Sequence, residues 1–205
     1  MSSHPVEIQI QSPARFDRLQ ILVRLVLAVA LGYLGLTFGW IACALYLVLP
    51  AVAAVYVSAR GSQAYLADVG PSVSRVLAWL VGLYAYMLMV IDRPHVSRDP
   101  AEIRVVIHPS GIPSIQAVVL RLLSSLPAAL LLAILLVPAA LFAAVGVVTV
   151  LLSRTQLEPL LRFQRGIICY AGRLAAYHAA LVDTYPSFTL EDAGPGAIDA
   201  AAGAR

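Results

Sequence analysis

Residues 122–153 read LLSSLPAALLLAILLVPAALFAAVGVVTVLLS, and none of them is charged. The stretch between Arg24 and Arg60 also lacks Asp, Glu, Lys and Arg. One helical crossing of a bilayer needs about 20 apolar residues, and each stretch exceeds that length. A soluble helix this long would present a polar face to water, and neither stretch has one. The sequence therefore predicts a protein inserted into a membrane through these two regions.

The composition of the chain supports this prediction. Hydrophobic residues make up 60% of the chain, charged residues 12%, and the mean hydropathy is +0.86. Soluble domains are typically about half apolar and a quarter charged. The net charge of +3 comes from arginine, since the chain contains no lysine. We interpret the arginines as determinants of membrane orientation. They form no basic run interleaved with aromatic residues, so we expect no nucleic-acid partner.

One sequence pattern occurs twice in the chain. Alternating apolar residues predict a short strand at residues 6–10 and another at residues 103–107. A hydrophobic run follows each strand, with Arg24 at the mouth of the first run and Arg121 at the mouth of the second, 97 positions apart. Each run is long enough for two short helices. We expect the breaks near Thr37-Phe38-Gly39-Trp40 and near Val137-Pro138, where proline interrupts a helix.

A further helix is predicted at the end of each half, over residues 72–92 and 160–183. The second is amphipathic, with Arg165 and Arg173 on a different face from its apolar residues, which favours a position in the membrane interface. The first is more hydrophobic. Placing both in the membrane plane puts the arginines on one side of the bilayer, in agreement with the positive-inside rule.

These elements predict an all-α membrane protein built from two tandem repeats. Each repeat has a short strand, a transmembrane helical hairpin and an in-plane amphipathic helix. The first spans residues 5–98 with its hairpin at 19–59, the second spans 101–190 with its hairpin at 116–153, and residues 191–205 form a flexible tail. Four crossings place both termini in the cytoplasm. Each crossing has only about 16–18 residues, or roughly 25 Å against a core of about 30 Å. Hairpins that enter and return without crossing are therefore the alternative.

The second repeat carries Phe163-Gln164-Arg165-Gly166, then Arg173 and Ala176-Tyr177, and ends in Asp183-Thr184-Tyr185-Pro186-Ser187-Phe188. In these residues the chain resembles an uncharacterised bacterial membrane family, domain of unknown function 4389. The resemblance extends over residues 5–190 as two tandem copies. The first copy departs from it, with Asp92-Arg93-Pro94-His95 where the second has Thr184-Tyr185-Pro186-Ser187. The resemblance implies a multi-pass protein of the bacterial cytoplasmic (inner) membrane and brings no activity with it.

Candidate lipid- or partner-binding residues lie along and just after the last predicted helix: Arg162, Arg165, Arg173, Tyr177, His178, Asp183 and Tyr185. As a polar cluster near the cytoplasmic surface, these side chains could bind an anionic headgroup or relay protons. The alternative is structural, with arginine reaching the interface, tyrosine anchoring there and aspartate ending the helix. His178 is also a candidate axial ligand of heme or a chlorin, although a single histidine on an apolar face is more often only hydrogen-bonded.

The sequence gives no sign of a cofactor or a metal site. Cys43 and Cys169 lack the spacing of a metal or redox pair, and we interpret both as reduced thiols. The chain has no G-x-S-x-G elbow, no phosphate-binding glycine loop and no paired acidic metal site. We therefore expect no enzymatic activity.

The expected function is a non-enzymatic integral membrane scaffold or accessory subunit of a larger membrane complex. Its basic cytoplasmic face would contact anionic lipids, and its protein partner would be another membrane protein or a second copy of the chain. A lipid-acting enzyme is one alternative, and it requires Arg173, His178 and Asp183 to converge on an open pocket. A small oligomeric transporter or channel is the other, and it requires one wet path lined by Tyr33, Thr37, Tyr46 and Thr149.

Overall fold

The computed structural model describes residues 5–33, 38–93, 103–186 and 188. The predicted tail at 191–205, the stretch Pro94-His95 and the position of Thr37 lie outside the described residues. Most of the described chain is helical, and the elements follow one another as β1 (Val6–Ile10), α1 (Arg18–Tyr33), α2 (Phe38–Arg60), α3 (Ser62–Ala64), the π-helical turn η1 (Tyr65–Val69), α4 (Gly70–Met87), β2 (Ile103–Ile107), α5 (Ile115–Ser124), α6 (Leu126–Ser153) and α7 (Glu158–His178).

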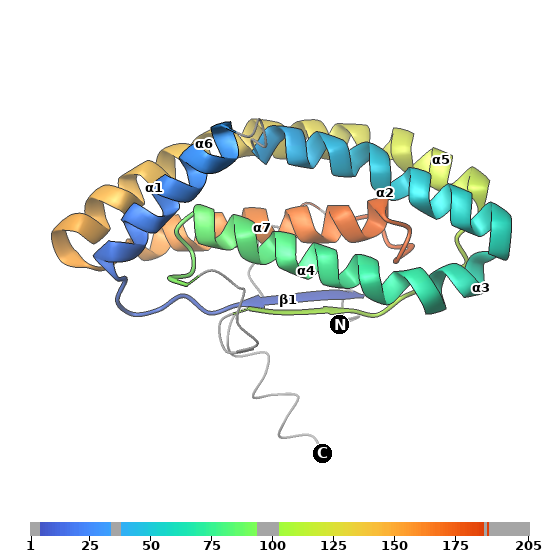
Figure 1. Ribbon diagram of the computed structural model, residues 1–205, viewed down its shortest axis with the longest axis horizontal. Helices are drawn as coiled ribbons and strands as arrows, with labels where there is room; N and C mark the ends of the chain where they lie inside the picture. The colour runs from blue at the N-terminus through green and yellow to red at the C-terminus, as the bar shows by residue number, and fades with distance from the viewer. Residues whose placement is uncertain (1–4, 34–37, 94–102, 187, 189–205) are drawn as a thin grey trace, which may run out of the picture.

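The elements form three layers (Figure 1). Strands β1 and β2 make the floor, helices α4 and α7 lie side by side in the middle, and α1, α2, α5 and α6 arch over them. We call these four upper helices the roof and the opposite face of the molecule the underside. The long axes of the strands, of α4 and of α7 run in the same direction, along the length of the molecule.

Both predicted strands are confirmed, and they pair with each other in a short sheet. They are antiparallel, with Val6 opposite Ile107 and Ile10 opposite Ile103. Alternate residues of β1 are buried, because one face of the sheet packs on the middle layer and the other faces outward. Gly172 of α7 permits this packing: a Cβ at this position would collide with Cδ1 of Ile8 and lie 3.2 Å from Cγ2 of Val81.

The predicted break near Val137-Pro138 is wrong. Helix α6 continues from Leu126 to Ser153 with Pro138 inside it, and the interruption lies at Ser125. A proline costs a helix one hydrogen bond, whereas a turn in apolar surroundings would leave several backbone groups without partners. At Ser125 such a partner exists, because the hydroxyl of Tyr46 donates a hydrogen bond to the carbonyl of Leu122. Pro127 then starts the new helix.

The two middle helices end earlier than predicted, α4 at Met87 and α7 at His178. Met89 and Ala180 adopt left-handed conformations, with φ of 64° and 55°. The amide of the next residue then bonds back over five residues in both helices, to the carbonyl of Ala85 in α4 and of Ala176 in α7. The chain therefore leaves both helices through the same kind of turn.

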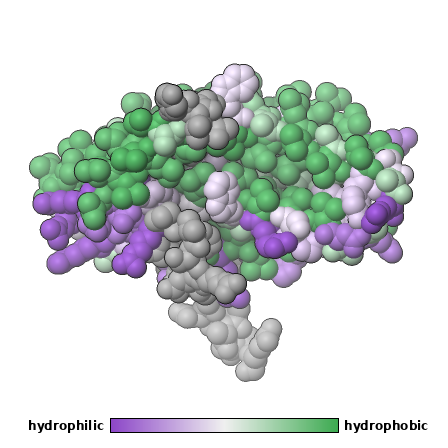
Figure 2. Space-filling view, in the orientation of Figure 1, coloured by the Kyte–Doolittle hydropathy of each residue, from purple (hydrophilic) through white to green (hydrophobic). Residues whose placement is uncertain are grey.

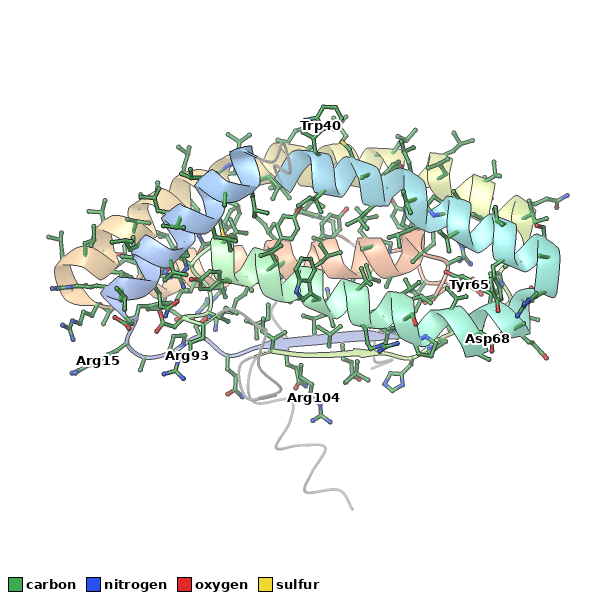
Figure 3. The ribbon with its side chains drawn as sticks, viewed as in Figure 1. Arg15, Trp40, Tyr65, Asp68, Arg93 and Arg104 are labelled. Carbon is green, nitrogen blue, oxygen red and sulfur yellow. The ribbon has the colours of Figure 1, made fainter. Side chains whose placement is uncertain are left out.

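In the described part of the chain, three helices are long and apolar enough to cross a membrane, at Cys43–Arg60, Ser62–Met87 and Leu126–Ser153. The roof is apolar toward the outside, whereas hydrophilic side chains gather along the lower margin of the molecule (Figure 2). Of the 30 large hydrophobic side chains exposed among the described residues, 24 belong to roof helices. Trp40 lies at the top of the roof and is 70% exposed, and Arg15, Arg93 and Arg104 lie on the underside (Figure 3).

Candidate functional site

The end of α7 collects polar side chains that come from three parts of the chain. Tyr177 and His178 form the last turn of α7, and the segment that follows brings Asp183 and Tyr185 back against α5. Roof helix α2 contributes Tyr46. Four of the seven predicted site residues therefore lie close together, beneath the junction of α5 and α6.

His178 is buried and both of its ring nitrogens have partners. Nε2 lies 2.5 Å from the carbonyl oxygen of Tyr46, and Nδ1 lies 3.0 Å from Oγ of Ser125. The Tyr46 ring stacks on the imidazole at a centroid distance of 4.1 Å. Since a carbonyl can only accept, Nε2 carries the proton and Nδ1 accepts from the serine hydroxyl. Burial lowers the pKa of His178, and the hydrogen bond to Tyr46 opposes that shift only in part. A metal-ligating role would require one of these hydrogen bonds to break.

Arg121 and Asp183 form an ion pair beside this histidine. The Arg121 side chain is 8% exposed and the Asp183 side chain is 45% exposed. The guanidinium also lies over the Tyr177 ring, 5.4 Å from its centre. Tyr177 in turn contacts Tyr185 edge to face. Gly111 fits against the Asp183 carboxylate, where a Cβ would collide with it. The cluster is thus a packed clamp between α5 and the end of α7.

The end of α4 carries a similar arrangement. Arg24 of α1 lies 4.4 Å from the centre of the Tyr86 ring and 3.9 Å from Oδ1 of Asp92. It also donates hydrogen bonds to the carbonyls of Tyr86 and Ile91, at 2.8 and 2.5 Å. Burial raises the pKa of Asp92, while hydrogen bonding from the Asp17 amide and the charge of Arg24 act in the opposite direction. We refer to the two sets Arg24–Tyr86–Asp92 and Arg121–Tyr177–Asp183 as the arginine clamps.

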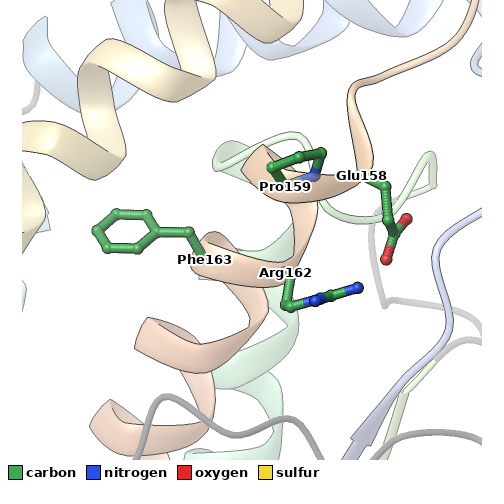
Figure 4. A pocket seen from close by; sticks show the side chains of 4 residues that line it. All are labelled: Glu158, Pro159, Arg162 and Phe163. Atoms are coloured by element: carbon green, nitrogen blue, oxygen red, sulfur yellow. The ribbon is translucent and has the colours of Figure 1, made fainter.

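The remaining predicted site residues do not join this cluster. Arg162 and Arg165 lie at the start of α7, at least 12 residues before Tyr177, which corresponds to about 18 Å along a helix. Arg165 forms an ion pair with Glu158 at 2.5 Å. Arg162 is exposed and lines a shallow hollow with Glu158, Pro159 and Phe163 (Figure 4). Arg173 is half-buried one turn before Tyr177. The predicted arginines of α7 therefore form no single binding site.

Four residues of the polar cluster were missing from the predicted site: Tyr46, Arg121, Ser124 and Ser125. Ser125 is completely buried, and Ser124 lies 3.1 Å from the hydroxyl of Tyr177. The sequence could have indicated these four residues by their type, because a tyrosine, an arginine and paired serines are unusual in otherwise apolar runs. Among the described residues, no group of three His, Cys, Asp or Glu side chains is placed to hold a metal ion. Cys43 is exposed and Cys169 is buried, and no disulfide joins them.

Comparison with known proteins adds one finding to this geometry. Residues 116–189 match a family model. It is described as Domain of unknown function (DUF4389). The matched segment holds all seven predicted site residues and the whole second arginine clamp, so the resemblance is confirmed for this part of the chain. No curated protein and no solved structure matches the chain.

Proposed function

We propose that this chain is a non-enzymatic membrane scaffold or accessory subunit whose roof is embedded in lipid. The observation that carries the proposal is the separation of apolar and charged surface. Soluble proteins rarely expose a continuous apolar patch beyond a few hundred Å², whereas here four neighbouring helices present mainly aliphatic side chains outward. Inserting this surface into hydrocarbon removes it from water, and the opposite face remains hydrated.

The same separation supports contact with anionic lipids at the cytoplasmic surface of a bacterial inner membrane. Among the described residues, eight arginines are exposed against five exposed carboxylates. Basic residues close to a membrane surface are attracted to anionic headgroups by roughly 1 kcal/mol each. The exposed arginines are Arg15, Arg18, Arg60, Arg75, Arg93, Arg104, Arg154 and Arg162.

We also propose that the two halves are tandem copies of one unit. Each half runs from a strand through two roof helices to a middle helix. The clamp arginines are 97 positions apart, and the clamp tyrosines and aspartates are both 91 apart. The left-handed residues Met89 and Ala180 share the spacing of 91. Duplication accounts for all of these correspondences together.

The competing functions receive less support. Tyr46 packs beside Ser125, whereas Thr149 lies 24 residues farther along α6 and bonds to the carbonyl of Gly146. About 36 Å of helix separates these positions, which argues against one wet path through a single chain. Tyr33 and Thr37 lack described side chains. For a lipid-acting enzyme, His178 and Asp183 would have to face an open pocket, but His178 is buried and Asp183 is paired with Arg121.

The proposal is tested by extracting the protein from its native membrane into lipid nanodiscs and identifying copurifying lipids and proteins by mass spectrometry. We expect anionic lipids to be enriched over the bulk membrane. Neutralising exposed arginines at the ends of the roof helices with Arg18→Gln, Arg60→Gln and Arg154→Gln should reduce this enrichment, while the matched roof change Leu22→Ile should leave it intact. A stoichiometric protein partner supports an accessory subunit. Solute flux in vesicles holding only this chain would instead favour the transporter.

A further inference from the structure

We propose that the roof occupies only one leaflet of the bilayer, so that the helices of crossing length lie in the membrane plane and the chain does not reach the other side. This inference rests on the proposed membrane insertion and specifies the surface that the roof contacts: the acyl chains of a single leaflet. The competing topology is the four crossings predicted from the sequence.

The first step is the relation between α6 and α7, which lie antiparallel along each other. Val150 of α6 clusters with Leu161 near the start of α7, and the Phe142 and Phe163 rings meet edge to face at 5.1 Å. Farther along, Ala128 packs with Tyr170 and Leu174. At the far end, Ser125 bonds to His178. Residue numbers fall along α6 as they rise along α7, so the two helices share one direction in space.

The second step follows from the residues that α7 carries. If α6 stood across the bilayer, α7 would stand beside it, with Arg165 seven residues from its first residue and Arg173 five residues from its last, so both would lie at the depth of the hydrocarbon. An arginine at that depth is among the most unfavourable residues for insertion. With α6 in the membrane plane, both side chains remain near the interface. The charge distribution of α7 therefore sets the orientation of the apolar helix above it.

The floor gives an independent argument for the same orientation. Strands β1 and β2 run along the molecule in the same direction as α4 and α7. They form a two-stranded sheet in the described part of the chain, so each strand has one edge without a neighbouring strand. Turning the long axis across the bilayer would carry these edges, and the exposed Glu7 and Arg104, into hydrocarbon. Open sheet edges do not occur facing lipid.

The depth of the roof fits one leaflet. A single layer of helices lies above α4 and α7, and a helix with its side chains is about 10–12 Å across. Half of the hydrocarbon core is roughly 15 Å. The two positions predicted to lie at far-side turns carry exposed apolar side chains, since Trp40 is exposed at the top of the roof and Val137 is exposed within the unbroken α6.

The test places single cysteines in the full chain on a Cys43→Ser, Cys169→Ala background, which removes both native thiols. Trp40→Cys and Val137→Cys report the two predicted far-side turns, and Arg104→Cys reports the underside. Right-side-out and inverted membrane vesicles are treated with a membrane-impermeant maleimide, and labelling after detergent denaturation confirms that each thiol is present. Quenching of a fluorophore at each position by lipids brominated at different depths measures how deep it lies.

One-leaflet insertion predicts that Arg104→Cys is labelled in one vesicle orientation and that Trp40→Cys and Val137→Cys are labelled in neither. Fluorophores at positions 40 and 137 should be quenched most by lipids brominated near the ends of their acyl chains. Labelling of Trp40→Cys or Val137→Cys from the side opposite Arg104→Cys would overturn this inference and leave membrane insertion standing. Labelling from the same side as Arg104→Cys would overturn insertion itself. Oriented circular dichroism provides a second measurement, in which a spectrum dominated by helices along the bilayer normal contradicts the one-leaflet placement.

Discussion

Arg24 holds Tyr86 in two ways at once: its guanidinium lies over the aromatic ring, and its Nε donates to the backbone carbonyl of the same residue. Arg24 belongs to the roof and Tyr86 to the middle layer, so one side chain joins the two layers at the helix end. Arg121 and Tyr177 show the same stacking in the second half. The arginines that mark the start of each hydrophobic run thus serve packing inside the protein.

Arg24→Gln should lower the free energy of unfolding by about 3 kcal/mol, because the buried carbonyls of Tyr86 and Ile91 lose charged donors and Asp92 loses its counterion. Thermal or denaturant unfolding in detergent micelles measures this loss. The matched change Arg18→Gln removes an exposed arginine from the same helix and should cost less than about 1 kcal/mol. Equal losses in the two variants would show that the clamp contributes no special stability.

Gly111→Ala should destabilise the protein and weaken the second arginine clamp. Gly111 has a φ of +85°, and a Cβ there would collide with the Asp183 carboxylate. Gly61 has nearly the same φ, +87°, and a Cβ added there would meet nothing within 4 Å. Gly61 has a ψ of 167°, a positive-φ conformation that is essentially limited to glycine. Gly61→Ala therefore reports backbone strain without a collision, about 1–3 kcal/mol. The excess loss in Gly111→Ala measures the collision, and adding Asp183→Ala should remove that excess.

Gly172→Ala should separate the floor from the middle layer, because the new methyl group meets Cδ1 of Ile8. We expect a loss of about 1–3 kcal/mol, typical of overpacking, measured by thermal unfolding. Ile8→Val removes the colliding carbon and should restore part of the loss in the double variant. Gly32→Ala, with nothing within 4 Å, should be neutral or slightly stabilising. Failure of Ile8→Val to compensate would place the strain elsewhere.

The stability of the protein should fall as the pH is lowered past the normal pKa of histidine. Burial lowers the pKa of His178 below its usual 6.5, so the unfolded chain binds a proton more readily than the folded one. The contribution of neutral His178 to the free energy of unfolding is then complete above pH 6.5. It is lost progressively as the pH falls through the lowered pKa. Unfolding scans from about pH 8 to about pH 5 measure this slope. His178→Gln should flatten it, and an unchanged slope in this variant would contradict the assignment to His178.

The sequence predicted the elements whose signal is local. Alternating residues in Val6–Ile10 and Ile103–Ile107 place one set of side chains on a buried face, and both strands occur where they were predicted. The error at Pro138 arose because a proline is a weaker break in apolar surroundings than in water. The helix ends at Met87 and His178 were missed because neither turn contains glycine, the usual residue for a left-handed position.

The site was predicted only where its residues are close in the chain. Tyr177, His178 and Asp183 lie within seven residues and were identified together. Their partners Arg121 and Tyr46 are 62 and 132 positions away from the groups they bind. No local pattern encodes such separations. The role of Arg121 as an internal clamp therefore became visible only once α5 was placed against the end of α7.

The pairing of β1 with β2 has a consequence for the order in which the molecule is completed. The two strands are about 97 residues apart, and ribosomes add roughly 5–20 residues per second. The first strand therefore leaves the ribosome several seconds before its partner and, with its apolar face uncovered, cannot finish the floor alone. During that interval the nascent first half is exposed to aggregation or to binding by chaperones. Closure of the floor must be a late event in biogenesis, and a chain interrupted before residue 103 would keep β1 permanently without its partner strand.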